Sequence, residues 1–80
     1  MKIRYDQSVD AAYISLLDDG EVGNFDFTYA CDPKEISGQI NLDFDLSGRL
    51  IGIEILQASK KLPVSLLVES RASKSTSVIS

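Results

Sequence analysis

The sequence predicts an α+β protein in which a single antiparallel β-meander of about five strands carries one C-terminal helix on one face. Three observations lead to this class. Apolar and polar residues alternate in several short segments, as in half-buried strands. Two of these segments form a hairpin with all large apolar side chains on one face, and after Leu56 the apolar period lengthens to that of a helix. The 80 residues suffice for one domain, predicted at 1–71, followed by a flexible Ser-rich tail at 72–80.

The best-defined stretch is a hairpin within residues 39–56. Its first arm places Ile40, Leu42 and Phe44 on one side, and Ser47-Gly48 suits a two-residue turn because glycine accepts a positive φ. A slip of one residue would turn the apolar set of one arm to the other face, so the alternation determines the register. The predicted pairs are Leu46–Arg49, Phe44–Ile51, Leu42–Ile53 and Ile40–Ile55.

Three strands precede this hairpin, at residues 2–5, 12–16 and 22–30. Asp19-Gly20, between the second and third strands, is a strong hairpin signal. Asp18 and Glu21 would face each other across that turn, and like charges are unfavourable there, so the loop can open into a longer one. The predicted pairs of this second hairpin are Leu16–Gly23, Ile14–Phe25 and Ala12–Phe27.

The C-terminal part begins with an expected loop at residues 31–38. After the fifth strand, a tight turn at 58–62 leads into a helix at 63–71, with Pro63 in the first turn because proline lacks an N–H. The apolar stripe of this helix should cover the isoleucine-rich face. The opposite face stays open to water or to a partner chain and carries Tyr13, Ser15, Thr28, Asn41, Asp43, Leu50, Gly52, Glu54 and Leu56.

Charge and composition exclude several classes of protein. The net charge of −4 argues against nonspecific nucleic-acid binding, which needs cationic side chains to displace counterions. No apolar run approaches the length of a membrane span, and residues 1–7 lack a signal-peptide core, so we expect the cytoplasm and no membrane partner. The chain has no histidine, which removes the usual general base and the commonest zinc ligand. Cys31 is the only cysteine, so we expect no internal disulfide, and we interpret it as a small half-buried residue rather than a reactive thiol.

One acidic constellation stands out on the open face. In the predicted register Asp43 faces Gly52 and Asn41 faces Glu54, so the two carboxylates lie on a diagonal with Cα atoms roughly 7–8 Å apart. Together with Asn41 they could ligate a hard cation such as Mg²⁺ or Ca²⁺, or act as acid and base. The more common role of such a pair is a solvated face that keeps the sheet soluble. Gly52 either admits a closely approaching group, for instance the Tyr13 ring, or marks a docking point for a partner.

Two smaller features have structural interpretations. Asp6 and Asp10 bracket a polar turn, where Asx-type hydrogen bonds to nearby backbone N–H groups are expected. Lys60-Lys61 is expected to cap a turn and face water, with phosphate contact as the minor alternative. A specific basic patch would combine these lysines with Arg71 and Lys74.

Two stretches resemble the domain of unknown function 2283 family of small prokaryotic proteins. The first is the opening MKIRYDQSVDAAYISL and the second is DFDLSGRLIGIEILQAS, so the resemblance extends to about Leu62 and does not reach 72–80. The chain departs from the family pattern at Ala12, where a larger residue is usual, and at Ser47, where Asn or Asp is commoner. The resemblance implies a small antiparallel sheet with a C-terminal helix and no established activity. It also implies that some relatives are partners in two-gene modules of the toxin–antitoxin kind.

Three functions are compatible with these observations. We favour a protein-interaction module, which self-associates or docks a partner, antitoxin-like or other, through the open sheet face or an edge strand. Its binding residues would be Tyr13, Asn41, Asp43, Gly52 and Glu54, without a cofactor. The alternative is a small metal-dependent enzyme that uses Asp43 and Glu54. The third, a nucleic-acid-binding module, conflicts with the acidic face.

Overall fold

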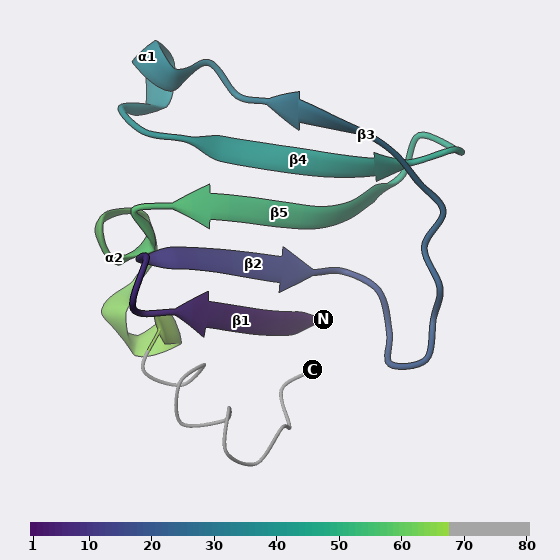
Figure 1. Ribbon diagram of the computed structural model, residues 1–80, viewed down its shortest axis with the longest axis horizontal. Coiled ribbons are helices and arrows are strands. Elements are labelled where there is room, and N and C mark those ends of the chain that lie inside the picture. The colour runs from purple at the N-terminus through teal and green to yellow at the C-terminus, as the bar shows by residue number, and fades with distance from the viewer. Residues whose placement is uncertain (68–80) are drawn as a thin grey trace.

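The computed structural model describes residues 1–67, which form one antiparallel sheet of five strands with short helices (Figure 1). The strand order is β1-β2-β5-β4-β3, so β1 and β3 are the edges of the sheet. The α+β class and the five strands are confirmed, whereas the predicted domain end at 71 and the tail at 72–80 lie outside the described residues. The elements are β1 (Lys2–Asp6), β2 (Ala11–Ser15), β3 (Phe25–Ala30), α1 (Pro33–Ile36), β4 (Ile40–Asp45), β5 (Leu50–Leu56) and α2 (Ala58–Lys61).

The order of the strands differs from the predicted meander. Strand β2 pairs with β1 and β5, while β3 lies at the far edge and pairs with β4. The predicted β2–β3 hairpin is therefore wrong, and Ala12 faces Tyr5 and Ile55 rather than Phe27. Residues 16–24 instead cross the end of the sheet where β4 and β5 are joined (Figure 1). Apolar alternation could not separate the two arrangements, because β3 and β5 both carry large apolar residues at a period of two.

The Asp19-Gly20 signal marks a real turn, but not a hairpin. The N–H of Glu21 donates to the carbonyl of Asp18 at 2.9 Å, and Gly20 has a φ of 82°. The carboxylate of Glu21 accepts from the N–H of Asp18 at 2.8 Å, which holds the turn in spite of the two like charges. The residues of the turn therefore predicted the bend correctly but did not predict which strands pair.

The β4–β5 hairpin keeps the predicted register at its open end and loses it near the turn. Ile40 faces Ile55 and Leu42 faces Ile53, as predicted. The register shifts after Asp43, so that Phe44 faces Leu50 and the predicted Phe44–Ile51 pair is wrong.

The turn of this hairpin explains the shift. Asp45 closes a turn longer than the predicted two residues: its N–H donates to the carbonyl of Arg49, and its Oδ1 accepts from the N–H groups of Ser47 and Arg49, all at 2.9 Å. Gly48 follows with a φ of 82°, and the Leu46–Arg49 pair does not form. The longer turn displaces the pairing by one residue, and the bulge in β5 shifts it back.

The hydrophobic core lies on one face of β1, β2 and β5, against α2 and a helical turn at residues 64–67. Ala12 is 2% exposed and Ala58 is 0% exposed, so two small residues meet where α2 reaches the sheet. The predicted tight turn at 58–62 is helix α2, and the predicted helix start after Pro63 is confirmed by the N–H of Leu66, which donates to the Pro63 carbonyl at 3.0 Å. The core residues are Tyr5, Ala12, Ile55, Ala58 and Leu67, with Ile14, Ile40, Ile53 and Leu62 packed around them.

Asp10 ties α2 to the turn between β1 and β2. Its carboxylate accepts from the hydroxyl of Tyr5 at 2.7 Å and from the N–H and hydroxyl of Ser59 at 3.0 and 2.7 Å. The Ser59 hydroxyl, and after it the Tyr5 hydroxyl, hold the pKa of Asp10 below its ordinary value. The predicted Asx bonding within the turn is confirmed at Asp6, whose Oδ1 accepts from the N–H of Ser8 at 3.0 Å. Asp10 instead joins segments far apart in sequence.

Residues 31–38, predicted as a loop, contain the short helix α1. Asp32 accepts from the N–H of Lys34 at 3.0 Å, and Pro33 occupies the first helical position with a preset φ. An Asp-Pro pair is thus the signal that the loop prediction missed. No helix within residues 1–67 is long and apolar enough to cross a membrane.

Lys61 was predicted to cap a turn and face water, but its side chain also binds a distant part of the chain. Its Nζ donates to the carbonyl of Ile36 and, at 3.0 Å, to that of Ser37, which satisfies acceptors at the end of α1. Lys60 is exposed, whereas Arg71 and Lys74 of the expected basic patch lie outside the described residues. Lys61 therefore connects the two short helices.

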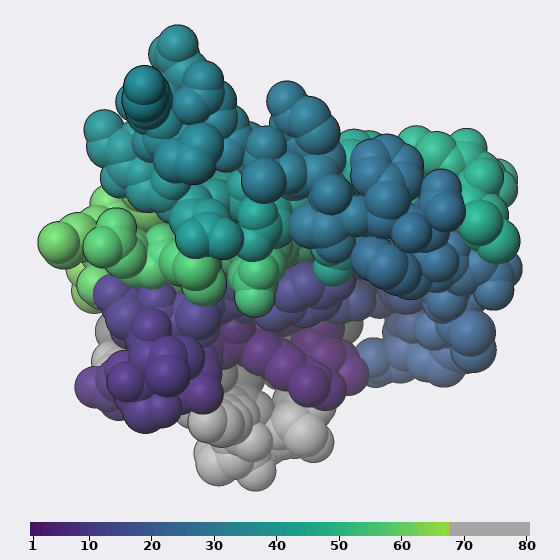
Figure 2. Space-filling view, turned by 45° about the horizontal axis from the view of Figure 1, so that its top comes forward, coloured from purple at the N-terminus to yellow at the C-terminus, as the bar shows by residue number. Residues whose placement is uncertain are grey.

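The part of the apolar face formed by β3 and β4 lies away from α2 and the helical turn that follows it (Figure 1). Phe27 and Tyr29 are 48% and 56% exposed, and the Phe27 ring stacks on that of Phe44 with centroids 5.2 Å apart. We call Phe27, Tyr29 and Phe44 the aromatic patch. Figure 2 shows β3 on the molecular surface, along the upper rim.

Candidate functional site

The predicted binding residues lie together on the polar face of β2, β5 and β4. Tyr13 on β2 faces Glu54 on β5, which faces Asn41 on β4. One step along the same face, Gly52 of β5 faces Asp43 of β4. Because β5 is central, residues of two sequence-distant strands meet across it.

Gly52 is the feature that brings Tyr13 and Asp43 into contact. A Cβ atom at Gly52 would lie 1.8 Å from Oη and 2.4 Å from Cζ of Tyr13, so the ring occupies the space that a side chain would need. The Tyr13 hydroxyl donates to Oδ2 of Asp43 at 2.8 Å. The interpretation of Gly52 as a point of close approach for the Tyr13 ring is confirmed, and the reason is steric rather than conformational.

Neutral side chains donate hydrogen bonds to the carboxylates of both Asp43 and Glu54. Asp43 accepts from Thr28 Oγ1 at 2.7 Å in addition to Tyr13, and Oε1 of Glu54 accepts from Asn41 Nδ2 at 2.8 Å. Thr28 was assigned to this face but not to the site, although the predicted meander already placed β3 beside β4, and the register of that pair brings Thr28 opposite Asp43. We call the hydrogen-bonded residues Tyr13, Thr28, Asn41, Asp43 and Glu54 the polar network.

The polar network is better suited to orienting side chains than to holding a metal ion. Within residues 1–67, no group of three or more Asp, Glu or Cys side chains could hold a metal ion. Asn41, Asp43 and Glu54 are the oxygen-bearing side chains of the expected cation site, and each already forms a hydrogen bond within the network. Cys31 is partly buried beside α1, in agreement with its interpretation as a small half-buried residue.

The environment of Tyr13 raises its pKa from 10.0 to about 12. Partial burial of the ring is the largest cause, followed by the hydrogen bond to Asp43 and the charges of Asp43 and Glu54. All of these disfavour the phenolate. Tyr13 therefore remains a hydrogen-bond donor at neutral pH.

This shift predicts a specific loss of stability at alkaline pH. Since the pKa is raised in the folded state, the stabilisation is complete below pH 10 and is lost as the pH rises from about 10 to about 12. The ring is partly exposed, so solvent screening should reduce the effect to about 1 kcal/mol. Urea unfolding at several pH values measures it, and Tyr13→Phe, which cannot ionise, is the control. Equal losses in the two proteins would contradict the assignment.

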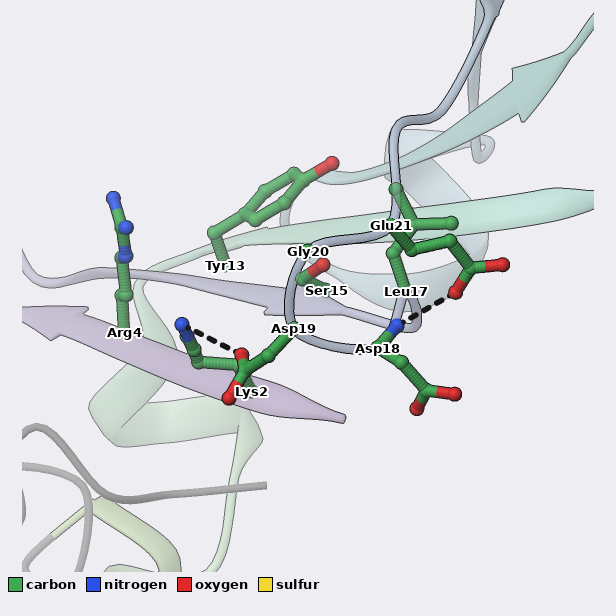
Figure 3. A pocket seen from close by; sticks show the side chains of 9 residues that line it. All are labelled: Lys2, Arg4, Tyr13, Ser15, Leu17, Asp18, Asp19, Gly20 and Glu21. Carbon is green, nitrogen blue, oxygen red and sulfur yellow. Dashed lines mark hydrogen bonds and ion pairs between the residues drawn. The ribbon is translucent and has the colours of Figure 1, made fainter.

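A pocket of about 350 Å³ adjoins the polar network on the side of β1 (Figure 3). The Tyr13 ring forms part of its wall, and Lys2 and Arg4 come from β1. Lys2 pairs with Asp19 of the 16–24 connection at 3.1 Å. Sequence reasoning missed this pocket because a β2–β3 hairpin would have placed residues 18–21 elsewhere. The lining residues are Lys2, Arg4, Tyr13, Ser15, Leu17, Asp18, Asp19, Gly20 and Glu21.

The fold and the polar face define a small single-sheet α+β protein whose polar face is bonded largely within itself. The model of DUF2283, a family described as a protein of unknown function, matches residues 2–59, and the chain belongs to this family. The match includes most of both stretches on which the resemblance was based. No curated protein and no solved structure matches the chain.

Proposed function

We propose that the chain is a protein-interaction module that binds through the open edge of β3 and the aromatic patch beside it. The observation that carries this proposal is the exposure of large aromatic side chains on an edge strand: 48% for Phe27 and 56% for Tyr29. Single exposed apolar residues are normal on protein surfaces, but grouped ones mark interaction sites. An edge strand also offers unpaired backbone groups to an incoming strand.

This surface lies on the face opposite to the one expected from the sequence. The polar network binds its own members, so a partner would have to displace formed hydrogen bonds at Asp43 and Glu54. A partner that covers the aromatic patch displaces none of these hydrogen bonds. It also removes apolar area from water, which is favourable. The proposal therefore keeps the predicted function and moves the binding surface to β3.

A charge placed in the patch tests the proposal. We expect wild-type protein in an extract of its source cells to elute in an assembly larger than its own 8.8 kDa, and Phe27→Lys to lose that assembly. Val22→Lys is the control, because Val22 is 84% exposed and the charge change is the same. Gel filtration with light scattering measures both. An assembly that survives Phe27→Lys, or is absent in the wild type, would refute the proposal.

The occupant of this surface can be another protein or a further copy of the chain. The resemblance to relatives in two-gene modules makes the product of a neighbouring gene one such partner. Co-expression of the neighbouring gene with either the wild-type chain or Phe27→Lys tests this form of the proposal. A neighbouring product that is harmless when expressed alone would count against a toxin partner.

A further inference from the structure

We infer that β3 pairs with β3 of a second copy of the chain, antiparallel and around a two-fold axis at Thr28. This inference rests on the proposed function, because it names the occupant of the same edge. The pairing joins two five-stranded sheets into one continuous sheet. Three properties of β3 carry the inference: the direction of its free backbone groups, the position of its one charge and the place of its aromatic residues.

The backbone groups of Thr28 point to the open edge. The N–H of Cys31 donates to the carbonyl of Ile40 at 2.9 Å, which makes Cys31–Ile40 a hydrogen-bonded pair of the β3–β4 ladder. Such pairs alternate with non-bonded pairs in antiparallel sheets. Thr28 and Ala30, which face Asp43 and Asn41, therefore direct their N–H and C=O groups away from β4. Two copies of Thr28 can then exchange both of their backbone hydrogen bonds.

The single charge of β3 disfavours a register centred on Asp26. Within Phe25–Ala30 only Asp26 is charged, and a two-fold axis at Asp26 would place two carboxylates opposite each other. With the axis at Thr28, Asp26 faces Ala30 of the second copy, and the two Asp26 residues are about 14 Å apart. The like charges of the strand are thus kept apart.

The aromatic residues complete the match. In this register Phe27 faces Tyr29 of the second copy on the same face as Phe44, and cross-strand aromatic pairs are favourable. The row that begins with the Phe27–Phe44 stack continues through Tyr29 and Leu42 of the second copy, since Tyr29 faces Leu42 within one chain. Both exposed members of the aromatic patch would then lie beside an aromatic neighbour.

The opposite edge lacks these properties. Strand β1 carries Lys2 and Arg4, and cationic side chains on an edge discourage pairing. Strand β3 contains neither lysine nor proline. The register shift between Phe25 and Phe27 falls at Asp26, so the regular part of β3 is residues 27–30, which contains the axis at Thr28. Pairing through β3 therefore predicts a closed dimer rather than a fibre.

Cysteine cross-linking of the full chain tests both the partner and the register. In a Cys31→Ser background, Thr28→Cys should form a covalent dimer on mild oxidation, because Cα atoms of a hydrogen-bonded pair are about 5.5 Å apart, within disulfide reach. Asp26→Cys in the same background is the matched control and should form no disulfide-linked dimer, because its two copies lie about 14 Å apart. Ala30→Cys is a second control with the same separation of about 14 Å, and it leaves both Asp26 and the Thr28–Asp43 hydrogen bond in place. Non-reducing electrophoresis and light scattering give the readout.

The outcomes separate this inference from the proposed function. A wild-type dimer in solution, with cross-linking at Thr28→Cys and not at Asp26→Cys, supports the inference. Cross-linking of Asp26→Cys as complete as that of Thr28→Cys would overturn the register. A monomeric purified protein without cross-links would overturn the second copy as the occupant. The proposed function would nevertheless survive if Phe27→Lys still abolished an assembly in extract.

Discussion

Gly52→Ala is expected to destabilise the fold by about 1–3 kcal/mol, an unusual cost for a glycine replaced by alanine inside a strand. The new Cβ would lie 1.8 Å from the Tyr13 hydroxyl oxygen, so the ring must leave its position over β5. The hydrogen bond from Tyr13 to Asp43 would be lost with it. Without such a neighbour, alanine should instead stabilise a strand by roughly 0.5–1 kcal/mol relative to glycine.

Removal of the ring should abolish this cost. In a Tyr13→Ser background we expect Gly52→Ala to be neutral or mildly stabilising, which corresponds to a coupling of about 1–4 kcal/mol between the two positions. Urea unfolding followed by circular dichroism measures the four proteins. Gly48→Ala is the control: its cost arises from a φ of 82° in open space, so it should be the same in both backgrounds. A Gly52→Ala cost independent of Tyr13 would show that steric contact is not the reason for glycine.

Ile55→Ala is expected to cost about 2–5 kcal/mol, the range for removal of a large buried aliphatic side chain. Ile55 is 3% exposed and lies at the centre of the cluster that joins α2 to the sheet. A domain of this size has a free energy of unfolding on the order of 4–12 kcal/mol, so this one substitution removes a large share. Thermal and urea unfolding measure the loss.

The matched control for Ile55→Ala is Leu46→Ala. Leucine and isoleucine are isomers, so both substitutions remove the same atoms, but Leu46 is 71% exposed at the tip of the hairpin. We expect its effect to stay within about 0.5 kcal/mol. Similar costs at the two positions would contradict a core centred on Ile55.

The candidate site could be predicted in part from the sequence. The placement of Tyr13, Asn41, Asp43, Gly52 and Glu54 on one face follows from their alternation with large apolar residues. The contact of Tyr13 with Asp43 could not be predicted, because it requires β2 to lie beside β5, whereas the meander placed β2 beside β3. The pocket beside Lys2 was missed for the same reason.

The sequence by itself determined which face most side chains of the sheet occupy and where the chain turns. These are local properties, since the pleat alternates at every residue and a turn depends on a few adjacent dihedrals. Only the tertiary structure decided that β5 rather than β3 lies beside β2, and that α2 approaches β2 while β3 and β4 lie farther away. Such choices result from competition between long-range pairings with the same apolar period, so the free energy of the whole sheet decides them.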